Sequence, residues 1–230
     1  IQYPASLPRR QAGSIQYTAG LSLGEYSTLV ASGVFDFEEA LRLVRKRAEL
    51  MEAQAEKHPG KMSAILGLER KVAEDICGES KAEIANLNCP GQIVISGKAE
   101  AVEKAKALAT GSGAKRVIDL EVSGAFHSSL MKEAAVEFKV FLGRSTLKAA
   151  SIPVISNVTA RPQQEIATIL ENLFKQIYSP VRWEDSVRFM AGGGIKTFYE
   201  IGPGNVLKGL LRKIDANLEV INIGKAEDVM

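Results

Sequence analysis

The pentapeptide GLSLG at 20–24, of the form G-x-S-x-G, is the feature that most constrains how this chain can fold. A β-prone stretch at 14–19 precedes it, and a helix-forming stretch follows. This order predicts a nucleophile elbow, in which a strand turns sharply into a helix and exposes the Ser22 hydroxyl at the bend. The turn is crowded, so glycines without a Cβ are expected on both sides of the serine. The helix would aim its free N–H groups and positive dipole end at a developing oxyanion.

Composition limits the other classes of function. The chain has 230 residues, 46% of them hydrophobic, which is enough for one large core with a smaller inserted unit. Its net charge of +2 gives no reason to expect nucleic acid or an anionic membrane as a partner. No apolar run reaches the length of a membrane span. Cys77 and Cys89 lack the spacing of a metal site, and we interpret them as free thiols of a reducing compartment.

The start of the chain has an unusual composition. It begins with Ile1, and its first acidic residue is Glu25. A basic, acid-poor start is typical of a transit peptide, but the initiating methionine is absent. This pattern favours a truncated or altered start.

The segment 61–120 predicts a compact unit of its own. Four stretches are strand-like, at 62–68, 84–88, 93–96 and 116–120, and two have helical patterns, at 71–79 and 99–111. In chain order these elements are β-α-β-β-α-β, which is the signature of a ferredoxin-like fold.

The flanking segments predict a larger α/β domain. The clearest helix runs from 36 to 57, where an apolar stripe recurs at spacings of three and four and Asp36 with Glu39 forms an N-terminal capping pair. Its stripe comprises Phe37, Leu41, Val44, Ala48, Met51 and Ala55. Further helices are expected at 128–142, 164–178, 183–191 and 206–214, and strands at 153–157, 197–201 and 219–223. This alternation favours a parallel sheet.

A serine nucleophile needs a base, and histidine is the usual one near neutral pH. The chain has two histidines. His58 lies in a Pro-Gly turn and is interpreted as a solvated surface residue. His127 follows a strand and begins a helix, where α/β enzymes tend to place catalytic groups. We therefore pair His127 with Ser22, although no carboxylate is placed by the sequence as a third member.

Arg47 belongs to a basic cluster on the 36–57 helix, and a solvated helix face is the ordinary explanation for such a cluster. It follows Val44 by three residues and precedes Met51 by four, so it borders the predicted buried stripe. From that border the planar guanidinium could turn toward a carboxylate in a cleft. Periodicity alone leaves both interpretations open.

Several blocks of sequence together resemble malonyl-CoA:acyl carrier protein transacylase of type II fatty acid synthesis. They follow the order of that family from about Thr18 to the C-terminal region. The blocks are AGLSLGEY (19–26), ASGVFDF (31–37), RAELM (47–51), NCPGQIVISG (88–97), GAFHSSLM (124–131), YSPVRW (178–183) and EIGPG (200–204).

The resemblance implies an α/β-hydrolase-like core with a parallel sheet, formed by 1–58 and 123–230, and an inserted ferredoxin-like (βαββαβ) subdomain at 59–122. It also implies a ping-pong reaction. Ser22 would take the malonyl group from malonyl-CoA and pass it to the phosphopantetheine thiol of acyl carrier protein. No bound cofactor or metal is implied. We expect a cytoplasmic monomer, with the plastid and the mitochondrial matrix left open as compartments.

The resemblance also assigns roles to individual residues. His127 matches the general base, with its ring oriented by a backbone carbonyl near Gln176. Arg47 matches the arginine that grips the free malonyl carboxylate. Phe126 resembles the form associated with selection of malonyl over methylmalonyl. The backbone N–H of Leu23 would be an oxyanion donor.

Two departures from the family pattern are visible. Leu21 stands where many members carry histidine, which leaves Ser22 unaffected. Nothing in 1–18 matches the Gly-Gln-Gly type loop that supplies a second oxyanion donor, and loss of one donor typically costs about 100- to 1000-fold in turnover. The chain could therefore be an incomplete homologue that only binds CoA or carrier protein. A serine acyl hydrolase or a polyketide acyltransferase domain would also carry such an elbow.

Overall fold

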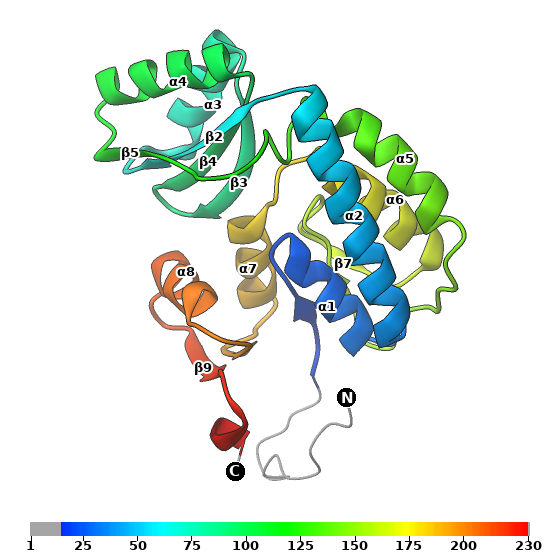
Figure 1. Ribbon diagram of the computed structural model, residues 1–230. Coiled ribbons are helices and arrows are strands. Elements are labelled where there is room, and N and C mark those ends of the chain that lie inside the picture. Colours follow the sequence, from blue (N-terminus) through cyan, green and yellow to red (C-terminus); the bar gives the residue numbers. More distant parts are fainter. Residues whose placement is uncertain (1–14, 230) are drawn as a thin grey trace.

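The structure is a computed structural model that describes residues 15–229 (Figure 1). The predictions made for 1–14, including the altered start and the first part of the β-prone stretch, lie outside the described residues. The first elements are β1 (Thr18–Ala19), α1 (Leu23–Ala31) and α2 (Phe37–Lys57). A strand followed within four residues by a helix is the connection that the pentapeptide predicts.

The middle of the chain forms the predicted ferredoxin-like unit. Its elements are β2 (Lys61–Leu66), α3 (Arg70–Ser80), β3 (Glu83–Cys89), β4 (Gln92–Gly97), α4 (Ala99–Gly111) and β5 (Arg116–Asp119). The strands pair antiparallel in the order β3-β4-β2-β5. Helices α3 and α4 cover one face, and their apolar side chains pack on Ile65 and Ile95 of the sheet. The order of elements is confirmed, whereas the domain limits 59 and 122 stay a prediction.

The larger body carries its strands in two small sheets. Strand β1 pairs parallel with β6 (Val154–Ile155), and β8 (Thr197–Ile201) pairs parallel with β9 (Glu219–Ile223). The sequence did not predict β7 (Pro162–Gln163), which pairs antiparallel with β6. The predicted parallel pairing is therefore present, but an antiparallel strand forms one edge of the first sheet. Two residues are too few for an alternating pattern to reveal β7.

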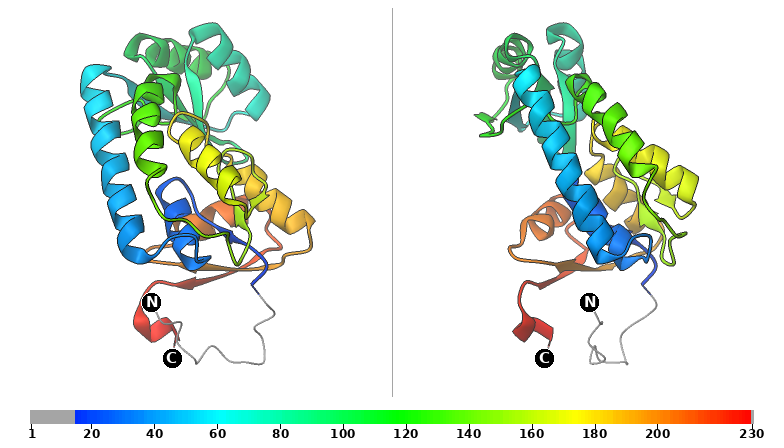
Figure 2. Two further views of the ribbon diagram at one scale, coloured as in Figure 1. Left: turned by 90° about the vertical axis from the view of Figure 1, so that its right-hand side faces the viewer. Right: turned by 45° about the vertical axis from the view of Figure 1, so that its right-hand side comes forward.

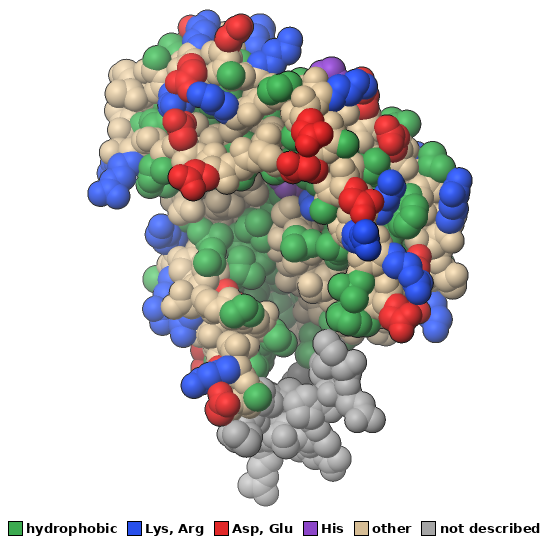
Figure 3. All heavy atoms as spheres, viewed as in Figure 1, with side chains coloured by type: hydrophobic (Ala, Val, Ile, Leu, Met, Phe, Trp, Pro, Cys, Tyr) green, Lys and Arg blue, Asp and Glu red, His purple; other side chains and the backbone are tan. Residues whose placement is uncertain are grey.

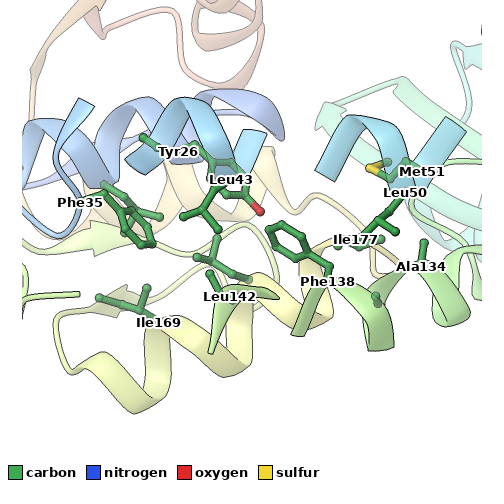
Figure 4. Close-up of a cluster of buried hydrophobic side chains, with 14 of the residues drawn as sticks. Tyr26, Phe35, Leu43, Leu50, Met51, Ala134, Phe138, Leu142, Ile169 and Ile177 are labelled. Carbon is green, nitrogen blue, oxygen red and sulfur yellow. The ribbon is translucent and has the colours of Figure 1, made fainter. Parts of the chain in front are cut away.

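Helices surround the main apolar core. The remaining helical elements are η1 (Ser129–Met131), α5 (Lys132–Leu142), α6 (Ile166–Gln176), α7 (Trp183–Gly192), α8 (Val206–Ile214) and η2 (Ala226–Val229). Helices α2, α5 and α6 lie side by side (Figure 2). Between them and α1 is a cluster of fully buried side chains that includes Tyr26, Leu43, Phe138 and Ile169 (Figure 4). This core fixes α1, which begins directly after Ser22, and α2, which carries Arg47.

Helix α2 buries a different face from the predicted one. Asp36 caps the helix, because its Oδ1 accepts a hydrogen bond from the backbone N–H of Glu39 at 2.8 Å. However, Phe37 is 56% exposed and Leu41 is 52% exposed. The buried residues are Ala40, Leu43, Arg47, Leu50, Met51, Gln54 and Ala55. The prediction counted only apolar residues and missed that Arg47 lies within the buried face, not at its border.

Candidate active site

The chain bends sharply at Ser22, as the pentapeptide predicts. Ser22 adopts φ 50° and ψ −105°, a backbone conformation that is costly for a residue with a side chain and that is found at functional turns. A Cβ on Gly20 would overlap the carbonyl group of Gly24, so only glycine fits at position 20. A Cβ on Gly24 would meet nothing within 4 Å. The expected need for glycine on both sides of the serine is therefore wrong for Gly24.

The amide side chains of Asn157 and Gln176 form hydrogen bonds with the backbone of the bend. The backbone N–H of Ser22 donates to Asn157 Oδ1 at 2.6 Å, and Asn157 Nδ2 donates to the carbonyl of Gly20 at 2.6 Å. Gln176 Nε2 donates to the carbonyl of Ser22 at 3.0 Å. Both residues come from distant parts of the chain. These bonds over-determine the strained backbone, which is the condition for such strain to persist.

The Ser22 hydroxyl contacts His127. Ser22 Oγ lies 2.9 Å from His127 Nε2, and His127 Nδ1 lies 2.9 Å from the backbone carbonyl of Gln176. A carbonyl oxygen can only accept, so Nδ1 carries the proton and Nε2 can accept from the serine hydroxyl. His127 is 5% exposed, and it also has a positive φ, 57°. The structure thus brings together three of the predicted site residues.

Burial sets the charge of this histidine. Burial first and the nearby Arg47 cation second lower the pKa of His127 to about 4. Imidazole is therefore neutral near pH 7 and able to act as a base. The other histidine, His58, follows helix α2 with 41% of its side chain exposed, as expected for a residue outside the site.

Arg47 reaches the same hydroxyl from helix α2. Its Nη2 donates to Ser22 Oγ at 3.1 Å, and the side chain crosses the Tyr26 ring with Cζ 5.7 Å from the ring centre. The residue is 7% exposed, and its Nε is buried without a hydrogen-bond partner. Within residues 15–229 no Asp or Glu side chain forms an ion pair with it. A buried guanidinium with a free donor is suited to bind a carboxylate.

A cleft of about 380 Å³ opens above these groups. Ser22, Arg47 and His127 line its floor together with Phe126, and the ferredoxin-like unit supplies the opposite wall through Met62, Asn86, Leu120 and Val122. Leu23 is the first residue of α1, so its backbone N–H belongs to the unsatisfied first turn of the helix. The cleft is therefore formed between the two parts of the fold.

The sequence did not single out Glu25, Asn157 or Gln163. Glu25 is fully buried below Ser22, where burial raises the pKa of its carboxyl to about 7 against the opposing effect of a hydrogen bond from Gln176. Asn157 follows β6, at the carboxyl end of the strand beside β1. The position of Asn157 was a usable signal, because ligands and catalytic groups gather at the carboxyl ends of parallel strands.

Metal ligands do not form part of this arrangement. Across the described range, no group of three or more His, Cys, Asp or Glu side chains could hold a metal ion. Cys77 and Cys89 are both buried and free. Within the same range, no helix is long and apolar enough to cross a membrane.

Comparison with known proteins identifies the class of this chain. The family model described as an acyl transferase domain matches residues 14–222, which is most of the chain. The chain is therefore an acyltransferase by class.

Individual relatives narrow this class. The chain is 49% identical over 218 residues to the malonyl CoA-acyl carrier protein transacylase of Bacillus subtilis (strain 168), a match that covers 93% of this chain and 69% of that protein. The crystal structure of an acyl carrier protein S-malonyltransferase from Vibrio cholerae superposes with a TM-score of 0.92 at 39% identity, covering 94% of this chain and 72% of that one. The chain belongs to the malonyl CoA-acyl carrier protein transacylase family, and the family resemblance seen in the sequence is confirmed.

A third match includes a partner. A malonyl-transacylase solved in complex with its type II PKS acyl-carrier protein superposes with a TM-score of 0.91 at 38% identity, covering 94% of this chain and 72% of that one. The relative in that structure therefore binds an acyl-carrier protein with a fold shared by nearly all of this chain.

Proposed function

We propose that this chain transfers the malonyl group from malonyl-CoA to the phosphopantetheine thiol of acyl carrier protein, through a malonyl ester on Ser22. The observation that carries the proposal is that His127 and Arg47 both contact the hydroxyl oxygen of Ser22. His127 Nε2 lies 2.9 Å from Ser22 Oγ, and Arg47 Nη2 lies 3.1 Å from it. A base and a carboxylate-binding cation at one nucleophile fit an acyl donor that carries a free carboxylate.

In the first half-reaction, His127 Nε2 accepts the proton of the Ser22 hydroxyl while Oγ attacks the thioester carbon. The carbon–sulfur bond then breaks, and the departing CoA thiolate takes the proton back from the imidazolium. In the second half-reaction, the phosphopantetheine thiol gives its proton to His127, and its sulfur attacks the ester carbon. Ser22 Oγ leaves and recovers its proton. Each half-reaction balances without a metal or a cofactor.

The negative charge of each tetrahedral intermediate needs a donor. We assign this role to the backbone N–H of Leu23, at the first position of α1. The donor is fixed before the reaction and lies at the positive end of the helix dipole. The Ser22 backbone N–H is not available for this purpose, because it already donates to Asn157.

Arg47 separates this function from simple ester hydrolysis. A hydrolase that accepts uncharged acyl groups gains nothing from a buried cation beside its nucleophile, and burying an uncompensated charge is costly. The malonyl carboxylate would supply the missing acceptor for Arg47 Nε. Phe126 also lines the cleft, and we propose that its ring limits the volume available beside the acyl group.

The remaining assignments follow from this function. We propose that residues 59–122 form a subdomain whose role is to close the cleft over the acyl group. We also propose a cytoplasmic location, which the bacterial relatives and the two free, buried cysteines support.

Intact-protein mass after brief mixing with malonyl-CoA tests the function. The parent chain should gain a malonyl-sized adduct, and Ser22→Ala should gain none. Arg47→Met should form the malonyl adduct far more slowly while its reaction with acetyl-CoA changes little. Arg45→Met is the matched control, because Arg45 lies on the same helix but has an 84% exposed side chain paired with Glu49. Absence of an adduct on the folded parent would contradict the proposal and favour a binding protein.

A further inference from the structure

A buried carboxylate lies directly beneath the nucleophile and takes no part in the two half-reactions. Glu25 has no exposed surface, and its carboxylate accepts three hydrogen bonds. The donors are Gln176 Nε2 at 2.6 Å, Gln163 Nε2 at 3.0 Å and the backbone N–H of Asn157 at 3.4 Å. No Lys or Arg forms an ion pair with Glu25 within the described part of the chain. A buried carboxyl without a paired cation is costly, so these directed bonds must supply its stabilisation.

The orientation of each amide is fixed by its other contacts. Gln163 Oε1 accepts a bond from Asn172 Nδ2 at 2.8 Å, which turns the Gln163 NH₂ group toward Glu25. Gln176 Nε2 is shared between Glu25 Oε2 and the carbonyl of Ser22, whereas Gln176 Oε1 is buried without a partner. An amide that leaves its own oxygen unpaired is held in that orientation by its acceptors. Of the two acceptors of Gln176 Nε2, Glu25 Oε2 lies closer, at 2.6 Å against 3.0 Å for the carbonyl of Ser22.

Gln176 is the link between Glu25 and the reacting groups. Its side chain contacts the Ser22 carbonyl, and its backbone carbonyl accepts from His127 Nδ1. One residue therefore sets the position of both the nucleophile and the base. A change in the Gln176 side chain would be felt at Ser22, and a shift of its backbone would be felt at His127.

We propose that Glu25 is a positioning residue for acyl transfer, which holds the Gln176 side chain and through it the relative placement of Ser22 and His127. This inference rests on the proposed function. In serine enzymes with a triad, an acidic side chain contacts the histidine directly. In this chain Glu25 does not contact His127 in that way. It contacts the side chain of Gln176, whose backbone carbonyl accepts from His127. The pKa of Glu25, raised to about 7 by burial, agrees with a carboxyl that is isolated from solvent.

A double-mutant cycle tests the proposal, with Glu25→Gln, Gln176→Met and the combined variant. Glu25→Gln keeps the shape but turns one acceptor oxygen into a donor that opposes an amide N–H. Gln176→Met removes the side-chain amide and keeps the backbone carbonyl. The readout is the rate at which Ser22 is labelled by a fluorophosphonate, measured beside the rate of malonyl adduct formation. Labelling by the fluorophosphonate requires the Ser22–His127 pair but does not require a carboxylate bound to Arg47.

Each single variant should slow labelling about tenfold, the lower end of the roughly 10- to 100-fold loss that follows removal of an outer hydrogen-bond partner at metal sites. In the Gln176→Met background, Glu25→Gln should cause no further loss. Additive effects would overturn the proposal, because Glu25 would then act independently of Gln176. If Glu25→Gln does not fold, Gln176→Met alone decides: an unchanged labelling rate overturns the proposal.

Ile169→Ala is the control for general loss of stability. Ile169 lies on helix α6 with Gln176 and is fully buried in the apolar core, away from the cleft. It should lower the thermal midpoint while the labelling rate of the folded protein stays at the parent value. An equal slowing in this control would reduce Glu25 to a structural role and overturn the proposal. A parent chain that reacts with the fluorophosphonate but forms no malonyl adduct would contradict the proposed function. The labelling rates of the four proteins in the cycle would still test the role of Glu25.

Discussion

The ferredoxin-like unit and the elbow region bury very different side chains. The interior of the ferredoxin-like unit, between its sheet and helices α3 and α4, is apolar and includes Ile65, Ile95 and Val102. The space beneath and beside Ser22 holds a carboxyl, a guanidinium, an imidazole and several amides. These buried residues are Glu25, Arg47, His127, Asn157, Gln163 and Gln176.

The backbone differs in the same way. In the ferredoxin-like unit, the non-glycine residue with positive φ is Lys81, which ends helix α3 in the left-handed conformation common at helix ends. In the elbow region, both Ser22 and His127 have positive φ. The two residues that we propose as nucleophile and base thus lie on a backbone that polar contacts must hold in place. Local strain and buried polar groups thus occur together around Ser22 and His127, while the ferredoxin-like unit follows ordinary packing rules.

A substitution in the elbow turn should have the largest effect on acylation. Gly20→Ala should abolish acylation of Ser22, because the new Cβ would overlap the backbone of Gly24. Gly24→Ala is the matched control, with open space at its Cβ. It should keep the parent rate and gain up to about 1 kcal/mol of stability from reduced chain entropy. Intact-protein mass with malonyl-CoA measures the first result and denaturant unfolding the second. An active Gly20→Ala variant would contradict the steric argument.

A cavity in the ferredoxin-like unit should lower stability and leave the acylation rate unchanged. Ile95→Ala removes a fully buried side chain and should lower the free energy of unfolding by about 2–5 kcal/mol. Acylation of the folded protein should stay at the parent rate, because Ile95 faces helices α3 and α4 and does not line the cleft. Urea unfolding and adduct kinetics measured on the same sample check both parts. A large loss of rate would show that the two units are coupled more tightly than their packing indicates.

Two buried groups of the elbow region should give opposite pH dependences. The pKa of Glu25 rises from 4.5 to about 7 on folding, so its favourable contribution is present below pH 4.5 and is lost as pH rises to 7. The pKa of His127 falls from 6.5 to about 4, so its contribution is present above pH 6.5 and is lost as pH falls to 4. Each change is on the order of 3 kcal/mol, and in the parent the two largely cancel.

Replacing one of the two residues should reveal how the other makes the unfolding free energy depend on pH. The unfolding free energy of Glu25→Gln should rise between pH 4 and 6.5, and that of His127→Gln should fall between pH 4.5 and 7. Equilibrium unfolding in urea at several pH values measures both slopes. Parallel slopes in the two variants would contradict the assignment of the two pKa changes.

The smallest expected effect concerns the exposed surface of the larger body. Tyr199 and Ile201 of β8 share a face with Ile221 of β9, and Ile201 is 77% exposed. Figure 3 shows charged side chains over the ferredoxin-like unit and helix α2, whereas apolar side chains gather in the hollow between α8 and α1. Ile201→Thr should reduce self-association measured by sedimentation and change stability by less than about 0.5 kcal/mol. Ile118→Thr, on an exposed site of β5, should leave self-association unchanged.

The features that could be predicted from the sequence are those set by residues close together along the chain. The pentapeptide placed Ser22 between a strand and a helix, and the ferredoxin-like order of elements was readable from alternating patterns. The sequence could not show that Glu25, Asn157 and Gln163 meet, because Glu25 and Asn157 are separated by 132 residues and join through hydrogen bonds that leave no periodic trace. The face of α2 was misjudged for a related reason. Its buried Gln54 is satisfied by the carbonyl of Leu130, a contact invisible to a count of apolar residues.

Both units of the fold contribute side chains to the lining of the cleft. Ser22, Arg47 and His127 belong to the larger body, whereas Met62, Asn86 and Leu120 belong to the ferredoxin-like unit. The residues proposed to react, together with Phe126, are therefore encoded in other stretches of sequence than the opposite wall of the cleft. Substitutions in the ferredoxin-like unit can change one wall of the cleft while Ser22, His127 and Arg47 keep their places in the larger body. Under the proposed function, part of the acyl preference can thus change independently of the reacting groups.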